Sequence, residues 1–234
     1  MNRLYPDRKK AEELLQDAEK CNPGPWGDHS RAVAMCAEKI ASACGNLDTD
    51  KAYVLGLLHD IGRKFGVKHF GHIYDGYMYM TELGYTDVAK ICLTHSFCIK
   101  RIEDYIGNID VTPEQKRVVE IELGEAVYDD YDLLIQLCDS IGAAEGVVPM
   151  ESRMGDVKRR YGREGHLFPF LVFQSFHLVN YCFFMVGGKG GFCKGFIWLS
   201  CKYTHNWNND KTCNHGKSTG IDWRLQNSWK STSA

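Results

Sequence analysis

Apolar residues recur every three to four positions through the first two-thirds of the chain, which is the period of a helix that buries one face. From Trp26 to Cys44, the apolar positions are 26, 33, 36, 37, 40 and 44. The segment that ends at His59 reads Ala-Tyr-Val-Leu-Gly-Leu-Leu-His and is apolar nearly all round, which predicts a central, buried helix. No segment of residues 1–161 alternates convincingly with a period of two. We therefore predict an all-α fold.

Helix breakers and capping residues divide this part of the chain into about eight helices, which we expect to pack on one core. Asn22-Pro23-Gly24-Pro25 interrupts the helical pattern, and Gly45 and Gly84 each end a periodic segment. Thr112-Pro113-Glu114-Gln115 is a capping box with proline at the first helical position, so one helix begins there. The other helices are expected at residues 8–20, 26–44, 48–59, 70–83, 86–95, 130–145 and 149–161.

The composition changes abruptly near residue 165. Residues 1–165 hold 28 acidic and 21 basic side chains, whereas residues 166–234 hold 2 acidic and 7 basic ones together with 14 of the 28 aromatic residues. We therefore predict a helical domain at 1–165 and an aromatic-rich, irregular C-terminal extension at 166–234.

Three interpretations of this extension compete: an added packing segment, a hydrophobic anchor, or a segment outside the ancestral reading frame, which we favour slightly. The apolar run at residues 167–186 approaches the length of a membrane span. Four polar side chains interrupt the run and weaken the case for membrane contact through it.

Composition also limits the partners and the compartment. Hydrophobic residues make up 44% of the chain and charged residues 25%, which is enough to build a folded core. The formal net charge of -2 argues against a nucleic-acid partner. The ten cysteines form no Cys-x-x-Cys pair, and the polar N-terminus shows no signal peptide, so we expect a cytoplasmic protein with reduced thiols.

The strongest chemical signal is the pair His59-Asp60 at the end of the buried helix. An aspartate rarely occurs there unless it is paired or binds a metal, because burying an unpaired charge is costly. Imidazole nitrogen next to carboxylate oxygen suits a divalent cation such as Mn, Fe or Co. Gly62 follows and allows a turn that aims both side chains at one point.

Further metal-ligating side chains are expected on core-facing positions of other predicted helices. His29 lies on an apolar stripe, His72 begins a helix, His95 ends one, and Asp139 lies inside the apolar run 133–141. A single histidine on an apolar face is more often a hydrogen-bonded core residue than a ligand, and His69 competes with His72. The metal hypothesis therefore depends on the ordered set of six residues.

This order on an all-helical chain resembles the HD superfamily of metal-dependent phosphohydrolases. The resemblance covers about residues 22–161 and is closest to bacterial domains of the His-Asp-Ile-Gly type. It is carried by Trp26-x-x-His29-Ser30-x-x-Val33-Ala34, by Gly56-Leu57-Leu58-His59-Asp60-Ile61-Gly62-Arg63 and by Leu93-Thr94-His95-Ser96-Phe97.

The resemblance implies a helical bundle with a binuclear centre. A first metal would be bound by His29, His59, Asp60 and Asp139, and Asp60 would bridge to a second metal held by His72 and His95. Asp60 and His59 would be the central catalytic residues, and a metal-activated water would hydrolyse a phosphoester or anhydride bond. We expect Fe, Mn or Co, with Zn, Ni and Mg as alternatives.

The expected substrate is a small phosphorylated compound, with a nucleotide as the leading candidate. Arg63, Lys64, Lys100 and Arg101 follow the proposed ligands closely and are candidates for binding its phosphate, although a role as surface charges is equally compatible with the sequence. Two other functions stay open: a di-iron oxygenase of the same superfamily and a non-catalytic nucleotide-binding regulator. The sequence contains no P-loop, no Gly-x-Gly-x-x-Gly and no Gly-x-Ser-x-Gly motif.

Overall fold

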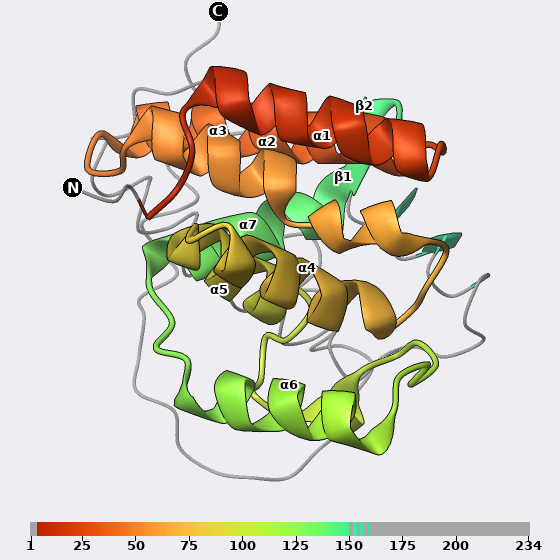
Figure 1. Ribbon diagram of the computed structural model, residues 1–234. Coiled ribbons are helices and arrows are strands. Elements are labelled where there is room, and N and C mark those ends of the chain that lie inside the picture. The colour runs from red at the N-terminus through yellow and green to blue at the C-terminus, as the bar shows by residue number, and fades with distance from the viewer. Residues whose placement is uncertain (1–3, 150–151, 154, 157–158, 160–234) are drawn as a thin grey trace, which may run out of the picture. The chain divides into compact units, whose positions relative to one another are not determined.

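The computed structural model describes residues 4–149, 152, 153, 155, 156 and 159, and this part of the chain is mostly helical, as Figure 1 shows. The prediction of an all-α fold is confirmed, and the described β structure is limited to one two-stranded antiparallel hairpin. The elements are α1 (Arg8–Cys21), α2 (Trp26–Cys44), α3 (Thr49–Leu58), the 3-10 helix η1 (Ile61–Phe65), α4 (Gly71–Glu82), α5 (Thr86–Thr94), the 3-10 helix η2 (Ile102–Asp104), α6 (Pro113–Glu125), α7 (Asp130–Ile141), β1 (Gly142–Ala143) and β2 (Gly146–Val147).

Local sequence signals explain where several helices begin and end. The Asp48 side chain accepts a hydrogen bond from the Lys51 amide and caps α3. At α6, the capping box predicted between Thr112 and Gln115 is present in both directions. Gly45 ends α2 in the left-handed conformation with a φ of 75°, which glycine adopts without a steric penalty.

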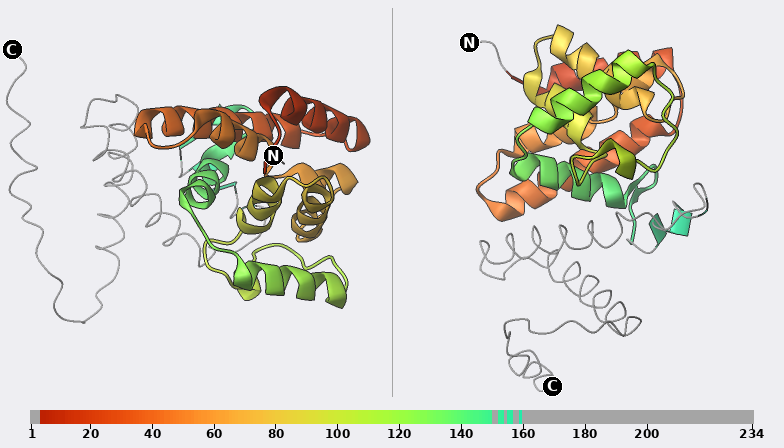
Figure 2. Two further views of the ribbon diagram at one scale, coloured as in Figure 1. Left: turned by 60° about the vertical axis from the view of Figure 1, so that its left-hand side comes forward. Right: turned by 90° about the horizontal axis from the view of Figure 1, so that it is seen from below.

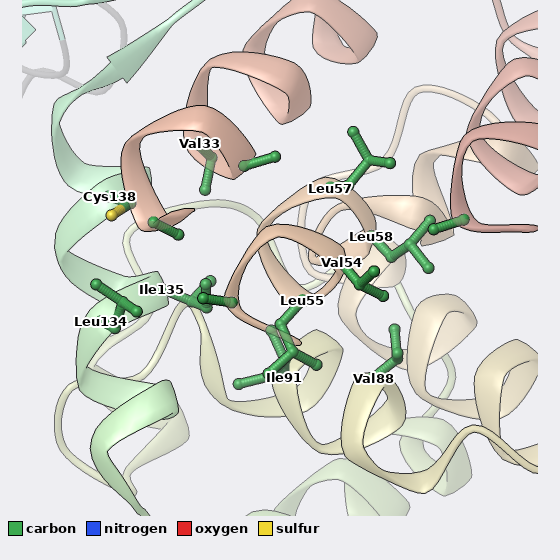
Figure 3. Packing of buried hydrophobic residues seen from close by; sticks show 14 of the residues in the cluster. Val33, Val54, Leu55, Leu57, Leu58, Val88, Ile91, Leu134, Ile135 and Cys138 are labelled. Atoms are coloured by element: carbon green, nitrogen blue, oxygen red, sulfur yellow. The ribbon is translucent and has the colours of Figure 1, made fainter. Parts of the chain in front are cut away.

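Helix α3 lies at the centre of the larger hydrophobic cluster, as its uniformly apolar sequence predicts. It contacts α1, α2, α5 and α7. Figure 3 shows Val54, Leu55 and Leu58 of α3 among side chains of neighbouring helices, and all three are buried. Because α3 is surrounded, its C-terminal end is held at a fixed position inside the bundle.

A second hydrophobic cluster corrects the prediction of a single core. It contains Phe70 and Ile73, the end of α5, and Val119 and Leu123 of α6. Tyr77 packs against both clusters, and its hydroxyl donates to Glu122 of α6 at 2.7 Å. Figure 2 shows α6 below α4 and α5, on the side away from α1. The capping box predicts where α6 begins but does not specify which layer the helix covers.

The region after α7 also differs from the prediction of a helix over 130–145. The helix ends at Ile141, and Gly142 pairs with Val147 in the hairpin. A Cβ on Gly142 would lie 2.8 Å from Val33 Cγ2, so the chain turns in close contact with α2. Of the six described residues in the predicted helix 149–161, five are helical and residue 149 is not. The proposed boundary at 165 and the extension 166–234 lie outside the described residues.

None of the described helices is long and apolar enough to cross a bilayer. The apolar run 167–186 lies outside the residues to which this finding applies.

The close approach of η1 to α4 predicts opposite effects for two glycine substitutions. A Cβ on Gly62 would lie 1.9 Å from the His72 carbonyl oxygen and 2.5 Å from the Gly76 nitrogen, whereas Gly124 in α6 has nothing within 4 Å. Gly62→Ala should therefore destabilise the protein by about 3 kcal/mol or more. Gly124→Ala should stabilise it by about 0.5–1 kcal/mol. Urea unfolding measures both, and a wild-type midpoint for Gly62→Ala would contradict the packing described here.

Candidate metal centre

Six side chains from separate elements converge at the ends of the helices. His29 comes from α2, and His59 and Asp60 follow the last residue of α3. The others are His72 from α4, His95 directly after α5 and Asp139 from α7. Their ligand atoms form two groups, each with all atoms within 4.8 Å of one another. The structure thus brings together all six residues that the sequence nominates, and their role as metal ligands stays a prediction.

The first group contains His29, His59 and Asp139. Asp139 Oδ1 lies 3.0 Å from His29 Nε2 and 3.6 Å from His59 Nε2. The His59 side chain is fully buried, whereas 26% of the Asp139 side chain is exposed. Two nitrogen atoms and one carboxylate oxygen therefore face one point that solvent reaches on the Asp139 side.

The second group contains Asp60, His72 and His95. Asp60 Oδ1 lies 3.2 Å from His72 Nε2 and 3.6 Å from His95 Nε2, and the two Nε2 atoms are 3.2 Å apart. The other oxygen of Asp60, Oδ2, lies 3.9 Å from His59 Nε2. Asp60 therefore belongs to the second group and also borders the first.

Backbone carbonyls orient three of the four imidazole rings. His59 Nδ1 bonds the Gly56 carbonyl at 2.7 Å, and His95 Nδ1 bonds the Cys92 carbonyl at 2.9 Å. His72 Nδ1 bonds the carbonyl of His69, whose own ring belongs to neither group. When Nδ1 is the donor, Nε2 carries the free lone pair, and metal-ligating histidines usually have such a second partner.

Two atoms inside the groups lack a hydrogen bond of acceptable geometry among the described residues. They are His59 Nε2 and Asp60 Oδ1, and neither has appreciable accessible surface. A buried polar atom without a partner costs about 1–3 kcal/mol, so native proteins rarely keep one without a function. The unsatisfied atoms face a nitrogen and oxygen donor set that suits a divalent cation.

A family model described as HD domain matches residues 26–144, just over half of the chain, and this range contains all six residues. The chain belongs to the HD-domain family. This membership implies a metal-dependent hydrolase type of activity. Neither a curated protein nor a solved structure shows significant similarity to the chain.

Burial and charge work against each other inside the HD domain. Burial favours the neutral form of the Asp60 and Asp139 carboxyl groups. Nearby imidazoles and Arg63 outweigh burial, so the pKa values of both groups lie well below their usual range. Arg63 and His72 have the largest effects on the pKa of Asp60, and the nearby imidazoles of His29 and His59 lower the pKa of Asp139. Both acids are therefore ionised at neutral pH, which is the state that binds cations.

The two buried histidines next to Asp60 differ in their protonation. Burial lowers the pKa of His59, but the carboxylates of Asp60 and Asp139 outweigh burial and raise the pKa above its ordinary value. For His95, burial and the nearby positive charge of His59 lower the pKa to about 3. His95 is therefore a neutral imidazole over the whole physiological range.

The HD domain has a cavity of about 770 Å³ beside these groups. Five of the six residues line it, and so does Arg63, whose Nε lies 2.5 Å from Asp60 Oδ2. The structure does not bring the other predicted phosphate-binding residues to this cavity. Lys64 bonds the Tyr79 hydroxyl, Lys100 bonds the Ala126 carbonyl, and Arg101 pairs with Asp104.

Sequence reasoning missed several polar residues that line the cavity, among them Gln136 and Arg153. The Gln136 amide nitrogen donates to the carbonyls of Thr94 and Phe97, so it ties α7 to the residues that flank His95. Its position one helical turn before Asp139 is a signal that could have identified it. Arg153 follows the hairpin, lies beyond the matched range, and belongs to no motif that could have identified it.

The depressed pKa of His95 predicts how the stability of the metal-free protein depends on pH. In the unfolded chain His95 binds a proton near its ordinary pKa of 6.5, whereas in the folded protein it does so only near about 3. Between these values the proton favours unfolding, so stability falls as the pH decreases, by up to about 1.4 kcal/mol per pH unit.

His95→Gln should remove this contribution. Urea unfolding with a chelator present, at pH 6.5, 5.5 and 4.5, should give a shallower slope for the variant than for the wild type. The pKa of His59 is raised, so its contribution to stability changes only above pH 6.5. The pKa values of Asp60 and Asp139 are lowered, so their contributions change mainly below pH 4. Neither effect therefore dominates the slope between pH 6.5 and 4.5. Parallel curves for the two proteins would contradict the prediction.

Proposed function

We propose that this HD domain is a phosphohydrolase that uses two divalent cations to hydrolyse a small phosphorylated substrate, with a nucleotide as the leading candidate. The observation that supports this proposal most directly is the pair of His/Asp groups with Asp60 between them. Two neighbouring groups of imidazole and carboxylate donors, with Asp60 next to both, could hold the two cations of a two-metal hydrolase.

In this proposal His29, His59 and Asp139 hold one cation, His72 and His95 hold the other, and Asp60 contacts both. The mixed imidazole and carboxylate set favours Fe, Mn or Co, with Zn, Ni or Mg as alternatives. When bound, the cations would lower the pKa of a water molecule and polarise the phosphoryl oxygens. His59 and Asp60 are the residues that we expect to be indispensable for this chemistry.

The charges in the centre support an anionic substrate. Asp60 and Asp139 supply two negative charges, which cannot neutralise two divalent cations. Along the cavity wall, the charges of Arg63 and Arg153 are offset by those of Glu145 and of Asp156, which pairs with Arg153. A site loaded with two divalent cations would therefore keep a positive excess that a phosphate group would compensate.

A substrate panel combined with metal analysis tests the proposal. Purified full-length protein would be analysed for Fe, Mn, Co, Zn, Ni and Mg and assayed on phosphomonoesters, phosphodiesters and nucleotides, with and without oxygen. We expect at least one phosphorylated compound to be hydrolysed equally well in both atmospheres. A reaction that requires oxygen and iron would favour the di-iron oxygenase, and binding of nucleotides without turnover would favour the regulator.

The proposed bridging position of Asp60 predicts a large effect of a conservative change. Asp60→Asn keeps the size of the side chain but removes the charge, so turnover should fall by at least about 1000-fold, equivalent to several kcal/mol of transition-state stabilisation. Asp17→Asn is the matched control, because Asp17 is exposed on α1 and pairs only with Lys20 among the described residues. Near-normal turnover by Asp60→Asn, assayed at the same concentration as the wild type, would contradict the proposed two-metal mechanism.

A further inference from the structure

The two oxygens of Asp60 have different partners. Oδ1 faces His72 and His95 and has no hydrogen bond within the described part of the chain, whereas Oδ2 accepts a hydrogen bond from Arg63 Nε at 2.5 Å. Oδ2 is also the oxygen that lies nearer to the first group, 3.9 Å from His59 Nε2. The guanidinium of Arg63 therefore occupies the oxygen that Asp60 would need in order to bridge the two groups.

The backbone around Arg63 is fixed, so only its side chain can move away from Asp60. Asn22 Nδ2 donates to the Arg63 carbonyl at 2.6 Å, and the Arg63 amide donates to the Asp60 carbonyl at 3.0 Å. Gly62 of η1 is packed closely on α4, because a Cβ there would lie 1.9 Å from the His72 carbonyl oxygen. The Arg63 side chain is 32% exposed and lines the cavity, which offers space for another rotamer.

Arg63 carries the charge that the centre needs when no cation is bound. Asp60 is buried, and an unpaired buried carboxylate would be strongly destabilising. The Arg63 guanidinium compensates this charge through the 2.5 Å contact between Arg63 Nε and Asp60 Oδ2. Once a divalent cation approaches Asp60, the same guanidinium becomes an unfavourable like charge.

We propose that Arg63 is the counter-ion of Asp60 in the metal-free protein and competes with the metal for Oδ2. Loading of the centre displaces the guanidinium, which then binds the phosphate group of a ligand in the cavity. Arg63 is thus a positioning residue that couples metal loading to phosphate binding. This inference rests on the proposed metal centre and is independent of whether the bound phosphate compound is hydrolysed.

The test measures Mn²⁺ binding to full-length protein that has been stripped with a chelator. The variant Arg63→Met removes the guanidinium and keeps the aliphatic chain. Arg31→Met is the matched control, because Arg31 is also 32% exposed and pairs with a carboxylate, that of Glu19, but does not line the cavity. Competition with a chromophoric chelator gives the dissociation constant, and thermal unfolding with and without Mn²⁺ gives the stability of each state.

We expect Arg63→Met to bind Mn²⁺ at least about fivefold more tightly than the wild type, the lower end of typical coupling between ligands. Its metal-free form should melt at a lower temperature, and Mn²⁺ should remove most of this difference. Arg31→Met should keep the wild-type affinity and lower both melting temperatures alike. Unchanged or weaker Mn²⁺ binding by Arg63→Met would overturn the proposal and leave Arg63 as a structural ion pair.

Inorganic phosphate tests the second half of the proposal. Calorimetric titration of the Mn²⁺-loaded proteins should show weaker phosphate binding for Arg63→Met than for the wild type and Arg31→Met. Equal phosphate affinity in all three loaded proteins would overturn the transfer of Arg63 to the ligand. If Arg63→Met does not fold without metal, Arg63→Gln replaces it in both measurements. Glutamine keeps a neutral hydrogen-bond donor, so Mn²⁺ and phosphate affinity should change in the same directions but by smaller factors. Turnover is not measured, so failure here is distinguishable from failure of the proposed function.

Discussion

The structure depends on keeping two ionised carboxylates, Asp60 and Asp139, among the ends of apolar helices. Transfer of a charge from water into such surroundings is unfavourable unless other groups compensate it. Here the compensation comes from imidazoles and from Arg63, which hold both pKa values far below their usual range. The compensation is incomplete, because His59 Nε2 and Asp60 Oδ1 have no hydrogen bond among the described residues. A site of this kind is stable enough to fold and still has a preference for added cations.

The bundle positions these charges through backbone contacts. Helix α3 is buried, so its C-terminal end can place His59 and Asp60 deep inside the domain. The tight packing of Gly62 against the His72 carbonyl then fixes the distance between this end and α4. On the other side, Gln136 ties α7 to the carbonyls around His95. Side chains that are far apart in the sequence therefore meet at one place in the bundle.

The two His/Asp groups were largely predictable from the sequence, because each of their members combines a burial pattern with an unusual polar residue. His59-Asp60 ends an apolar helix, and Asp139 interrupts an apolar run, so the cost of burial itself identifies them. The phosphate-binding candidates were less predictable, because proximity in sequence does not specify direction. Lys64 follows Arg63 directly but points to Tyr79, since successive residues of a helical turn face different sides. The hairpin after Ile141 and the second hydrophobic cluster, to which α6 contributes, depend on tertiary contacts that the local hydrophobic periodicity does not encode.

The cavity wall shows why family membership indicates the reaction type more clearly than the substrate. All six residues of the two groups lie within residues 26–144, the range that matches the HD domain. The cavity is also lined by Asn22, Glu145 and Arg153, which lie on either side of that range. The parts that would hold cations and the parts that would contact the rest of a ligand therefore come from different stretches of the chain. Substitutions in the flanking stretches can therefore change which ligand fits the cavity while both His/Asp groups are kept.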